Sequence, residues 1–212
     1  MFTDYSGAKI LIDGYKSIPP IDIHTNIAQL LNVERDPTAK RINFGLLNGM
    51  GVKKLAVSLF LSLQEAQRIH KKYDQMVPEA KGFLRLAETY ARKRGWVRTK
   101  LGRRRHFPDW RIAHKAGNSI VQGTAADMTK LKMVEIDEFF ERNGASSYLS
   151  LQVHDELDWF TAKGEEKVTA EARRIMTSFG PNDVIQFKVP MTLDSHQAPD
   201  WGRASFPDYK WQ

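Results

Sequence analysis

A short polar segment between two apolar runs gives the strongest local constraint on this chain. The segment Val153–Glu156, with the sequence VHDE, follows the run Tyr148–Gln152 and precedes the run Leu157–Phe160. This pattern predicts a β-hairpin with His, Asp and Glu at its tip. An acid at a tight tip is exposed and rigidly aimed, as a carboxylate ligand of a divalent metal must be. A solvated turn would carry the same residue types, so this segment alone leaves both interpretations open.

An earlier segment is typical of a helix with a mixed polar and aromatic face. Asp36 can cap this helix, and Pro37 fits its first position, where no amide hydrogen bond is lost. Lys40, Phe44 and Asn48 are spaced four apart and therefore share one helix face. A cation, an aromatic ring and an amide in one stripe suit a phosphate, a base or a sugar. An ordinary mixed surface would look the same.

Four segments together resemble the family A DNA polymerases, the group that includes bacterial DNA polymerase I. They occur in the family's order between about residues 20 and 200. The segments are KRINFGLLNGMG (40–51), similar to motif B of the fingers, RTKLGRRRHFPD (98–109), similar to a basic hairpin, GNSIVQGTAAD (117–127), similar to a palm helix, and LQVHDEL (151–157), similar to motif C. The resemblance implies template-directed DNA synthesis, in which a deoxynucleoside triphosphate (dNTP) extends the 3′-hydroxyl of a primer by a mechanism that uses two Mg²⁺ ions.

The resemblance also implies an α+β fold, with a helical fingers subdomain on a palm of antiparallel strands and helices. We expect a partial palm segment at residues 1–24, the fingers at 25–112 and the palm at 113–212. Within the last two regions, the pattern predicts a helix from about 109 to 142 that is broken or bent near its glycines 117 and 123, and a final strand near Phe187–Leu193.

The first metal aspartate of such an enzyme would come from motif A, which reads DYSxxExR in many relatives. The chain contains Asp4-Tyr5-Ser6, but no glutamate or arginine follows closely, and Asp22, which resembles the start of the family's DIH, comes only 18 residues after Asp4. If Ser6-Gly7 is aligned after the motif A helix, the interval becomes natural. The chain then begins after motif A, lacks the thumb and any exonuclease domain, and needs a complementing fragment. The other interpretation keeps Asp4 as the catalytic aspartate, with a local deletion behind it.

The resemblance assigns catalytic roles to three residues. Asp155 would bind Mg²⁺, and Glu156 would assist the metal or hold the hairpin. Lys40 would neutralise the β- and γ-phosphates and donate a proton to the leaving pyrophosphate. Asp4 remains the second candidate metal ligand.

The incoming nucleotide is expected to meet one set of side chains in the fingers. These residues are His24, Arg35, Lys40, Phe44 and Asn48. Arg35 departs from the family pattern, because it lies five rather than four residues before the lysine. Phe44 would pack on the sugar. Asn48 stands where many relatives have a tyrosine that stacks beside the templating base, and an amide cannot stack comparably.

Primer–template DNA is expected to meet a second set of residues. These are Asn118, Gln122, His154, His114, Lys115, Arg103, Arg104 and Arg105. Asn118 and Gln122 would contact the minor groove, whose acceptors are nearly independent of sequence. His154 would position the primer end. The three arginines would meet backbone phosphates, although a solvated basic turn has the same composition.

The composition agrees with a polyanionic partner. There are 32 basic and 25 acidic residues, a net charge of +7, and no cysteine. Disulfides and thiolate metal sites are therefore excluded. We see neither an apolar stretch of membrane-spanning length nor a secretion signal, so we expect no membrane span. The resemblance implies a protein of the bacterial or phage-infected cytoplasm.

Two alternatives to a complete DNA polymerase stay open. An inactive module could hold the primer–template or assist assembly without chemistry. A single-subunit RNA polymerase shares the general motif plan. The QGTAAD segment, Glu156 and the pair Phe44-Gly45 favour the DNA enzyme.

Overall fold

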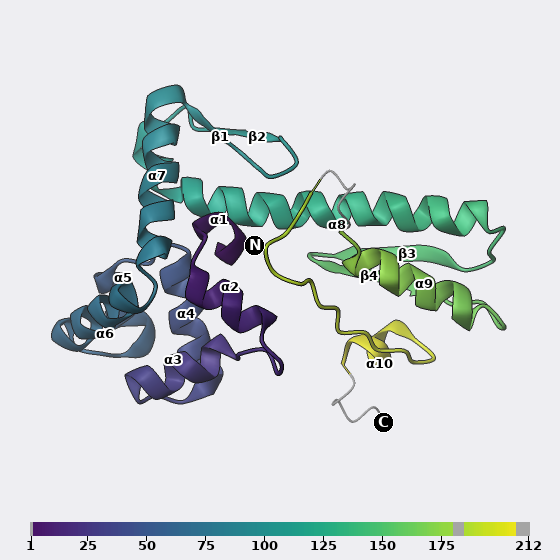
Figure 1. The fold of residues 1–212 in the computed structure, drawn as a ribbon, viewed down its shortest axis with the longest axis horizontal. Helices are drawn as coiled ribbons and strands as arrows, with labels where there is room; N and C mark the ends of the chain where they lie inside the picture. Colours follow the sequence, from purple (N-terminus) through teal and green to yellow (C-terminus); the bar gives the residue numbers. More distant parts are fainter. Residues whose placement is uncertain (1, 180–184, 207–212) are drawn as a thin grey trace. The chain divides into compact units, whose positions relative to one another are not determined.

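The computed structural model describes residues 2–179 and 185–206, which fold as two compact units. The first unit comprises residues 1–125 and 187–190, and the second comprises residues 126–186 and 191–212. Figure 1 shows the elements of both. Helices and short antiparallel strands are mixed, so the fold is α+β as expected. The boundary between fingers and palm at residue 112 stays a prediction.

The first unit is mainly helical. Its elements are α1 (Phe2–Ser6), α2 (Lys9–Lys16), α3 (Ile23–Leu31), the π-helical turn η1 (Arg35–Ala39), α4 (Lys40–Leu47), α5 (Val52–Leu59), α6 (Leu63–Met76), α7 (Pro78–Arg94), β1 (Trp96–Arg98), β2 (Arg104–His106), the 3₁₀ helix η2 (Trp110–Lys115) and the start of α8 (Ala116–Arg142). Asp36 keeps an extended backbone (φ −117°, ψ 131°), so the helical turn that continues as α4 begins after it, near the expected position.

Local signals in the sequence explain where several of these helices begin and end. Ser62 and Glu65 form a reciprocal capping box at the start of α6. Pro78 occupies the first position of α7, and Gly95 ends that helix with φ 76°, a backbone conformation that glycine adopts without strain. The core beneath them centres on Ile27 and Ile42, which are fully buried.

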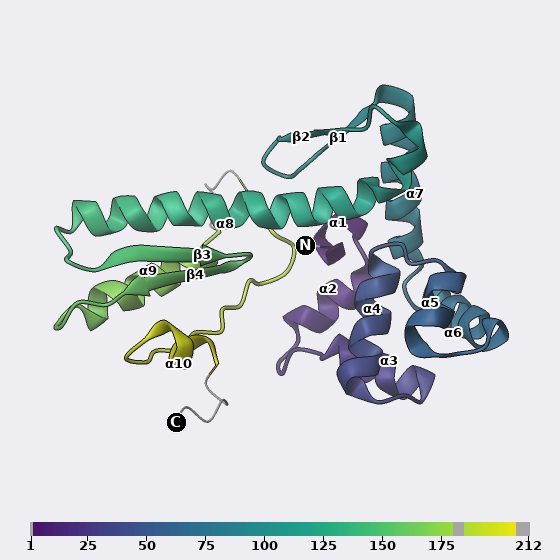
Figure 2. The same cartoon turned by 180° about the vertical axis from the view of Figure 1, so that it is seen from behind.

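The second unit is a β-hairpin packed against two helices. It contains the rest of α8, then β3 (Tyr148–Val153), β4 (Glu156–Phe160), α9 (Glu166–Thr177) and α10 (Trp201–Ser205). The two strands pair antiparallel, which confirms the predicted hairpin. Figures 1 and 2 show the hairpin and α9 along the carboxyl-terminal part of α8, where Ile136, Phe140 and Ala172 form the core.

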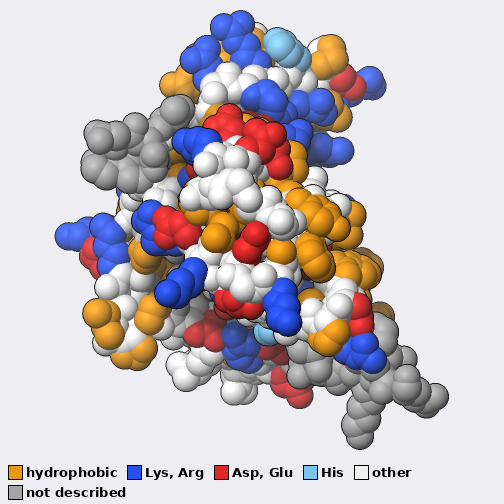
Figure 3. Space-filling view, turned by 90° about the vertical axis from the view of Figure 1, so that its right-hand side faces the viewer, with side chains coloured by type: hydrophobic (Ala, Val, Ile, Leu, Met, Phe, Trp, Pro, Cys, Tyr) orange, Lys and Arg blue, Asp and Glu red, His pale blue; other side chains and the backbone are white. Residues whose placement is uncertain are grey.

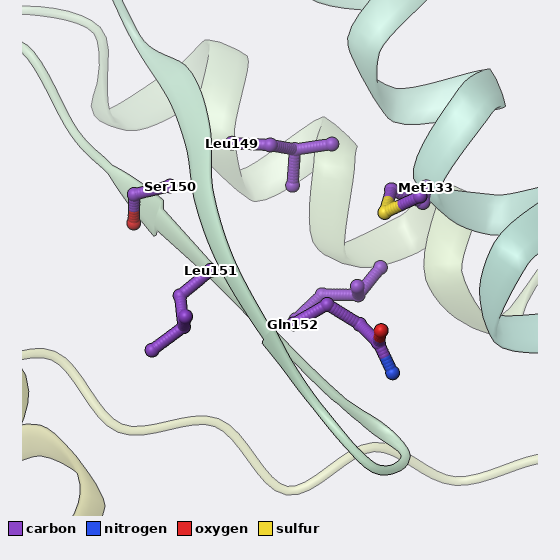
Figure 4. Close-up of a pocket in the computed structure, with 6 residues that line it drawn as sticks. Met133, Leu149, Ser150, Leu151 and Gln152 are labelled. Carbon is purple, nitrogen blue, oxygen red and sulfur yellow. The ribbon is translucent and has the colours of Figure 1, made fainter.

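An irregularity in β3 turns two neighbouring side chains the same way. The register shifts between Leu149 and Leu151. Figure 4 shows Leu149 and Gln152 on the side of Met133 from α8, whereas Ser150 and Leu151 point away from it. A cavity of about 170 Å³ lies among these residues. Because Met133, Leu149 and Leu157 contribute to its lining and no charged residue does, we assign the cavity to imperfect packing of the hairpin on α8.

The predicted break at Gly123 and the predicted final strand are both wrong. Helix α8 begins at Ala116, where it follows η2 and just precedes Gly117, and it continues through Gly123 without interruption. Instead, these glycines permit close packing, since a Cβ atom would lie 2.5 Å from Leu84 Cδ2 at Gly117 and 2.9 Å from Thr99 Cγ2 at Gly123. The segment Phe187–Leu193 forms no strand, and Pro190 within it cannot donate a ladder hydrogen bond. Across the described part of the chain, we find no helix with the length and apolarity needed to cross a membrane.

Candidate nucleotide and nucleic-acid site

The hairpin tip presents an acid to solvent. His154 makes the turn with a left-handed backbone (φ 55°) and is exposed. Asp155 follows it, is exposed, and accepts no hydrogen bond from any residue that the structure describes. Glu156 Oε1 accepts a hydrogen bond from Ser205 Oγ at 3.2 Å. The tip thus offers one uncommitted carboxylate and a second one that is held in place.

Asp158 is a neighbouring acid that the sequence analysis did not single out. Burial raises its pKa, as do the negative charge of Glu156 and a hydrogen bond with it, while a hydrogen bond from Trp201 Nε1 (3.2 Å to Oδ2) lowers it. These acids border a hollow of about 920 Å³ that is lined by the hairpin, α9 and the segment 192–205. The i, i+2 spacing of Glu156 and Asp158 on one strand could have revealed this pair.

Among the described residues, no group of three or more His, Asp or Glu side chains is arranged to hold a metal ion. Asp155 nevertheless has the chemistry that Mg²⁺ requires, because it is an exposed carboxylate that none of the described residues engages. The tip therefore fits one carboxylate ligand of a metal site, but the described residues do not form a complete one.

Asp4 has a different environment. It lies on α1 and is only 4% exposed. Its Oδ1 accepts a hydrogen bond from the Lys188 amide at 2.7 Å, and its Oδ2 forms an ion pair with the Lys100 ammonium group. Beside it, the Tyr5 hydroxyl lies 2.6 Å from Thr124 Oγ1. The DYS segment is thus part of the packing of the first unit.

Helix α4 carries the cationic and aromatic stripe. Lys40, Phe44 and Asn48 are all exposed, and Phe44 has 52% of its surface accessible although it is large and apolar. The His24 ring lies 5.3 Å from the Phe44 ring, centre to centre. An exposed phenylalanine beside a lysine and an imidazole offers a face for a sugar and charges for phosphate.

Arg35 is engaged with two carboxylates. Its Nε donates to Asp22 Oδ2 at 2.8 Å, and it also pairs with Asp36. The hydrogen bond from Arg35 lowers the pKa of Asp22 to about 2. Asp22 in turn caps α3 by accepting from the His24 amide at 2.9 Å. To reach a nucleotide, Arg35 would have to leave this arrangement.

A chain of hydrogen bonds runs from the buried Tyr73 through Asn43 to His24, and we call it the relay; the sequence did not reveal it. The Tyr73 hydroxyl donates to Asn43 Oδ1 at 2.9 Å, and Asn43 Nδ2 approaches His24 Nδ1 at 3.4 Å. Tyr73 and Asn43 are almost fully buried. Burial raises the pKa of Tyr73 and, together with nearby cations, lowers that of His24. A neutral imidazole that accepts at Nδ1 carries its proton on Nε2, so the free edge of the ring is a hydrogen-bond donor.

The predicted DNA-contacting residues of the first unit lie on α8, η2 and the β1–β2 hairpin. Gln122 is exposed, and Asn118 Oδ1 is buried with no hydrogen-bond partner among the described residues. His114 Nδ1 lies 2.9 Å from the Arg111 carbonyl oxygen, and Lys115 is exposed.

The three arginines of the hairpin are not equivalent. Arg103 donates to the Gly123 carbonyl oxygen at 3.1 Å, so its guanidinium group helps to hold the hairpin. Arg104 lies over the Trp96 ring and Arg105 over the Phe107 ring.

Comparison with known proteins identifies the family. The family model for DNA polymerase family A matches residues 1–203. The chain belongs to the family A DNA polymerases. This assignment favours the DNA enzyme over the RNA polymerase alternative.

Its relatives include phage and bacterial polymerases. DNA polymerase DpoZ of Acinetobacter phage SH-Ab 15497 is 30% identical over 98% of this chain and 37% of its own length. The thermostable DNA polymerase I of Thermus aquaticus is 35% identical over 85% of this chain and 23% of its own length.

A solved structure is similar as well. The POL domain of Pol1 from M. smegmatis, in complex with DNA primer-template and dNTP, matches 90% of this chain with a TM-score of 0.77 and 27% identity, and the match spans 36% of that structure. This family A polymerase chain therefore spans between 23% and 37% of the length of the relatives named here.

Proposed function

We propose that this chain supplies the fingers and part of the palm for template-directed DNA synthesis, in which a dNTP extends a primer 3′-hydroxyl. The observation that supports this proposal most directly is the carboxylate of Asp155 at the tip of the motif C hairpin, which is exposed and accepts no hydrogen bond from a described residue. Family membership supports the reaction class. We place the activity in the cytoplasm, where template and dNTPs occur. Primer extension with Mg²⁺, all four dNTPs and a labelled primer tests it.

Asp155 is the proposed Mg²⁺ ligand, and Glu156 assists by holding the tip. Bound Mg²⁺ would lower the pKa of the primer hydroxyl and stabilise charge on the phosphates. Asp4 is not a ligand in this proposal, because its carboxylate is already satisfied by Lys188 and Lys100. The second metal aspartate would come from polypeptide outside these 212 residues.

The α4 stripe is the proposed nucleotide site. Lys40 would meet the β- and γ-phosphates and protonate the leaving group, and Phe44 would pack on the sugar. Asn48 would lie toward the templating base. His24 would donate from Nε2 to a phosphate oxygen. Arg35 would contribute only after exchanging Asp22 for phosphate.

Phe44→Tyr is expected to improve incorporation of dideoxynucleotides. The added phenol hydroxyl would sit beside the sugar and replace a contact that the missing 3′-hydroxyl normally makes. The measurement is the ratio of chain termination to extension in an active assembly, with Phe60→Tyr as the control because Phe60 is 97% exposed. An unchanged ratio for Phe44→Tyr would refute the sugar contact.

Tyr73→Phe is expected to raise the KM for dNTPs about fivefold, since one neutral hydrogen bond contributes roughly 1 kcal/mol. Without the phenol, the Asn43 amide is free to rotate, so it no longer fixes the tautomer of His24. Steady-state kinetics measure the effect, and long-range ¹H–¹⁵N NMR reads the tautomer directly. Tyr90→Phe, at an exposed tyrosine, is the matched control. A normal KM with the Nε2–H tautomer retained contradicts the relay.

Primer–template DNA is the proposed partner of α8, η2 and the basic hairpin. Gln122 and Asn118 would reach the minor groove, while His114 and Lys115 would lie near the template. His154 would position the primer end. Backbone phosphates would meet the arginines 103–105, those of the duplex at Arg103 and Arg105 and those of the unpaired strand at Arg104.

Arg105→Gln is expected to flatten the salt dependence of duplex binding. Loss of one phosphate contact lowers the log–log slope by about 0.9. The slope is measured by titrating a labelled duplex at several salt concentrations. Arg68→Gln on α6 removes the same charge from an exposed position and serves as the control. Equal slopes for the two variants would show that Arg105 is not a phosphate contact.

A second function is favoured by one observation. The carboxylate of Asp4 is paired with Lys100 and is therefore not available to a metal ion. Unless another segment completes the metal site, the 212 residues would hold primer–template DNA or assist assembly without catalysing synthesis. The extension assay separates the two functions.

A further inference from the structure

The carboxyl end of α7 and the β1–β2 hairpin carry arginines stacked on aromatic rings. We call the cluster of Tyr90, Arg94, Trp96, Arg98 and Arg104 the Trp96 patch. The guanidinium carbon of Arg94 lies 4.4 Å from the Tyr90 ring centre and 4.1 Å from the Trp96 ring centre. The corresponding distances to Trp96 are 4.6 Å for Arg104 and 5.5 Å for Arg98.

The charge of this region is of one sign. Residues 90–106 include eight Lys and Arg residues and no Asp or Glu. Arg94, Arg98 and Arg104 form no ion pair with any described carboxylate, and Arg94 Nε instead donates to the Trp96 carbonyl oxygen at 3.0 Å. Figure 3 shows Lys and Arg side chains gathered at its upper end, at the height of this hairpin in Figure 1. Three guanidinium groups around one ring repel one another, which a bound polyanion would relieve.

The aromatic rings beside these cations are accessible. Tyr90 is 43% exposed and Trp110 is 64% exposed. The guanidinium carbon of Arg92 lies 5.2 Å from the Trp110 ring centre, so the same combination is repeated next to the patch on α7. Large rings exposed among cations provide both a face for a base and donors for a phosphate.

We infer that the Trp96 patch and Trp110 bind an unpaired strand of DNA, with bases on the aromatic and guanidinium faces and phosphates on the guanidinium edges. In a duplex the faces of the bases are covered, so the exposed rings would contribute little there. In a single strand every base has an accessible face, which makes such stacking tolerant of sequence. Arginine suits this role because its flat, weakly hydrated cation stacks and donates in fixed directions.

The proposed function identifies this unpaired strand as the template. Only the identification as template rests on the proposed function, because the binding of an unpaired strand is argued from the patch itself. Successive side chains of β2 point to opposite faces of the hairpin, so the Trp96 patch and the proposed duplex contact at Arg105 lie on different faces. Arg104 lies over Trp96, whereas its neighbour Arg105 lies over Phe107. The two contacts can therefore be removed independently.

The test measures binding of the 212-residue chain to three labelled probes by fluorescence anisotropy. The probes are an oligothymidine of about 16 nucleotides, an abasic strand of the same length and a blunt duplex. The wild-type chain is expected to bind oligothymidine about tenfold or more tightly than the abasic strand, since stacking acts on several bases. Trp110→Ala is expected to weaken oligothymidine binding about fivefold or more and to leave abasic binding within about twofold.

A charge-conserving pair of substitutions separates stacking from simple attraction. Arg94→Lys with Arg104→Lys keeps the net charge but removes both planar cations, so it should weaken oligothymidine binding about fivefold while duplex binding stays within about twofold. Arg68→Lys with Arg85→Lys, at exposed arginines without an aromatic partner, is the matched control and should change neither. Circular dichroism confirms that each variant folds.

Three results would overturn the inference. The first is equal affinity of the wild-type chain for oligothymidine and the abasic strand. The second is unchanged oligothymidine binding by the Arg94→Lys, Arg104→Lys variant. The third is a loss of duplex affinity by that variant as large as its loss of oligothymidine affinity. Because binding is measured without synthesis, a chain that fails to extend primers but still prefers oligothymidine contradicts the proposed function and leaves this inference standing.

Discussion

Asp155→Asn is expected to lower nucleotide addition about a thousandfold or more in an active assembly. The substitution is nearly isosteric, but an amide lacks the negative charge that Mg²⁺ requires in a ligand. Loss of several kcal/mol of charge stabilisation in the transition state corresponds to roughly three powers of ten in rate. Because Asp155 is exposed and accepts no hydrogen bond from a described residue, stability and duplex affinity should change little.

The control for this experiment is Asp137→Asn, which neutralises an exposed aspartate on α8. Single-turnover extension measures the rate, and thermal unfolding checks the fold. If Asp155→Asn supports extension at a rate near that of Asp137→Asn, Asp155 is not a metal ligand. If it unfolds the protein instead, the carboxylate has a structural role that its exposure does not suggest.

The reliable predictions from sequence concern local structure. The hairpin around Asp155 was predictable because two apolar runs flank a short polar turn, and strand pairing across such a turn needs only local contacts. The start of α6 was predictable for the same reason, since the side chains of Ser62 and Glu65 each accept a hydrogen bond from the other residue's backbone amide within one turn of helix.

The wrong predictions concern packing. Gly123 was expected to break or bend the helix, but α8 continues through it without a break, and the absence of a Cβ atom leaves room for the Thr99 side chain. The strand expected near Phe187–Leu193 needed a neighbouring strand with which to pair, and an apolar run cannot reveal whether that neighbour exists.

The candidate site could be predicted only in part, because its decisive contacts join distant positions. Asp4 is separated by 96 residues from Lys100 and by 184 residues from Lys188. The relay from Tyr73 to His24 passes through Asn43, which the motif B resemblance covers without showing what the amide contacts. The residue types that recognise phosphate and sugar can be found in the sequence. Only the folded structure shows which of these side chains already bind other residues of the chain.

Primer extension is expected only when a fragment carrying DYSxxExR is added to the 212-residue chain, with a rise of about a thousandfold over the chain alone. A two-metal reaction needs two carboxylates, and the structure offers Asp155 while Asp4 is engaged by Lys100. The outer face of the motif C hairpin also exposes Tyr148, Leu151 and Phe160, an apolar surface that a further palm strand would cover.

The decisive variants separate the two interpretations of Asp4. Asp4→Asn combined with Lys100→Met removes both charges of the ion pair together, so the buried Asp4 position is not left as an unpaired ion. If Asp4 is structural, this double variant should extend primers with the added fragment at nearly the normal rate, whereas an aspartate-to-asparagine change in the fragment's motif should abolish extension. If the chain extends primers alone and loses that activity in the double variant, Asp4 is the motif A aspartate. In that case the ion pair with Lys100 is exchanged for metal during catalysis.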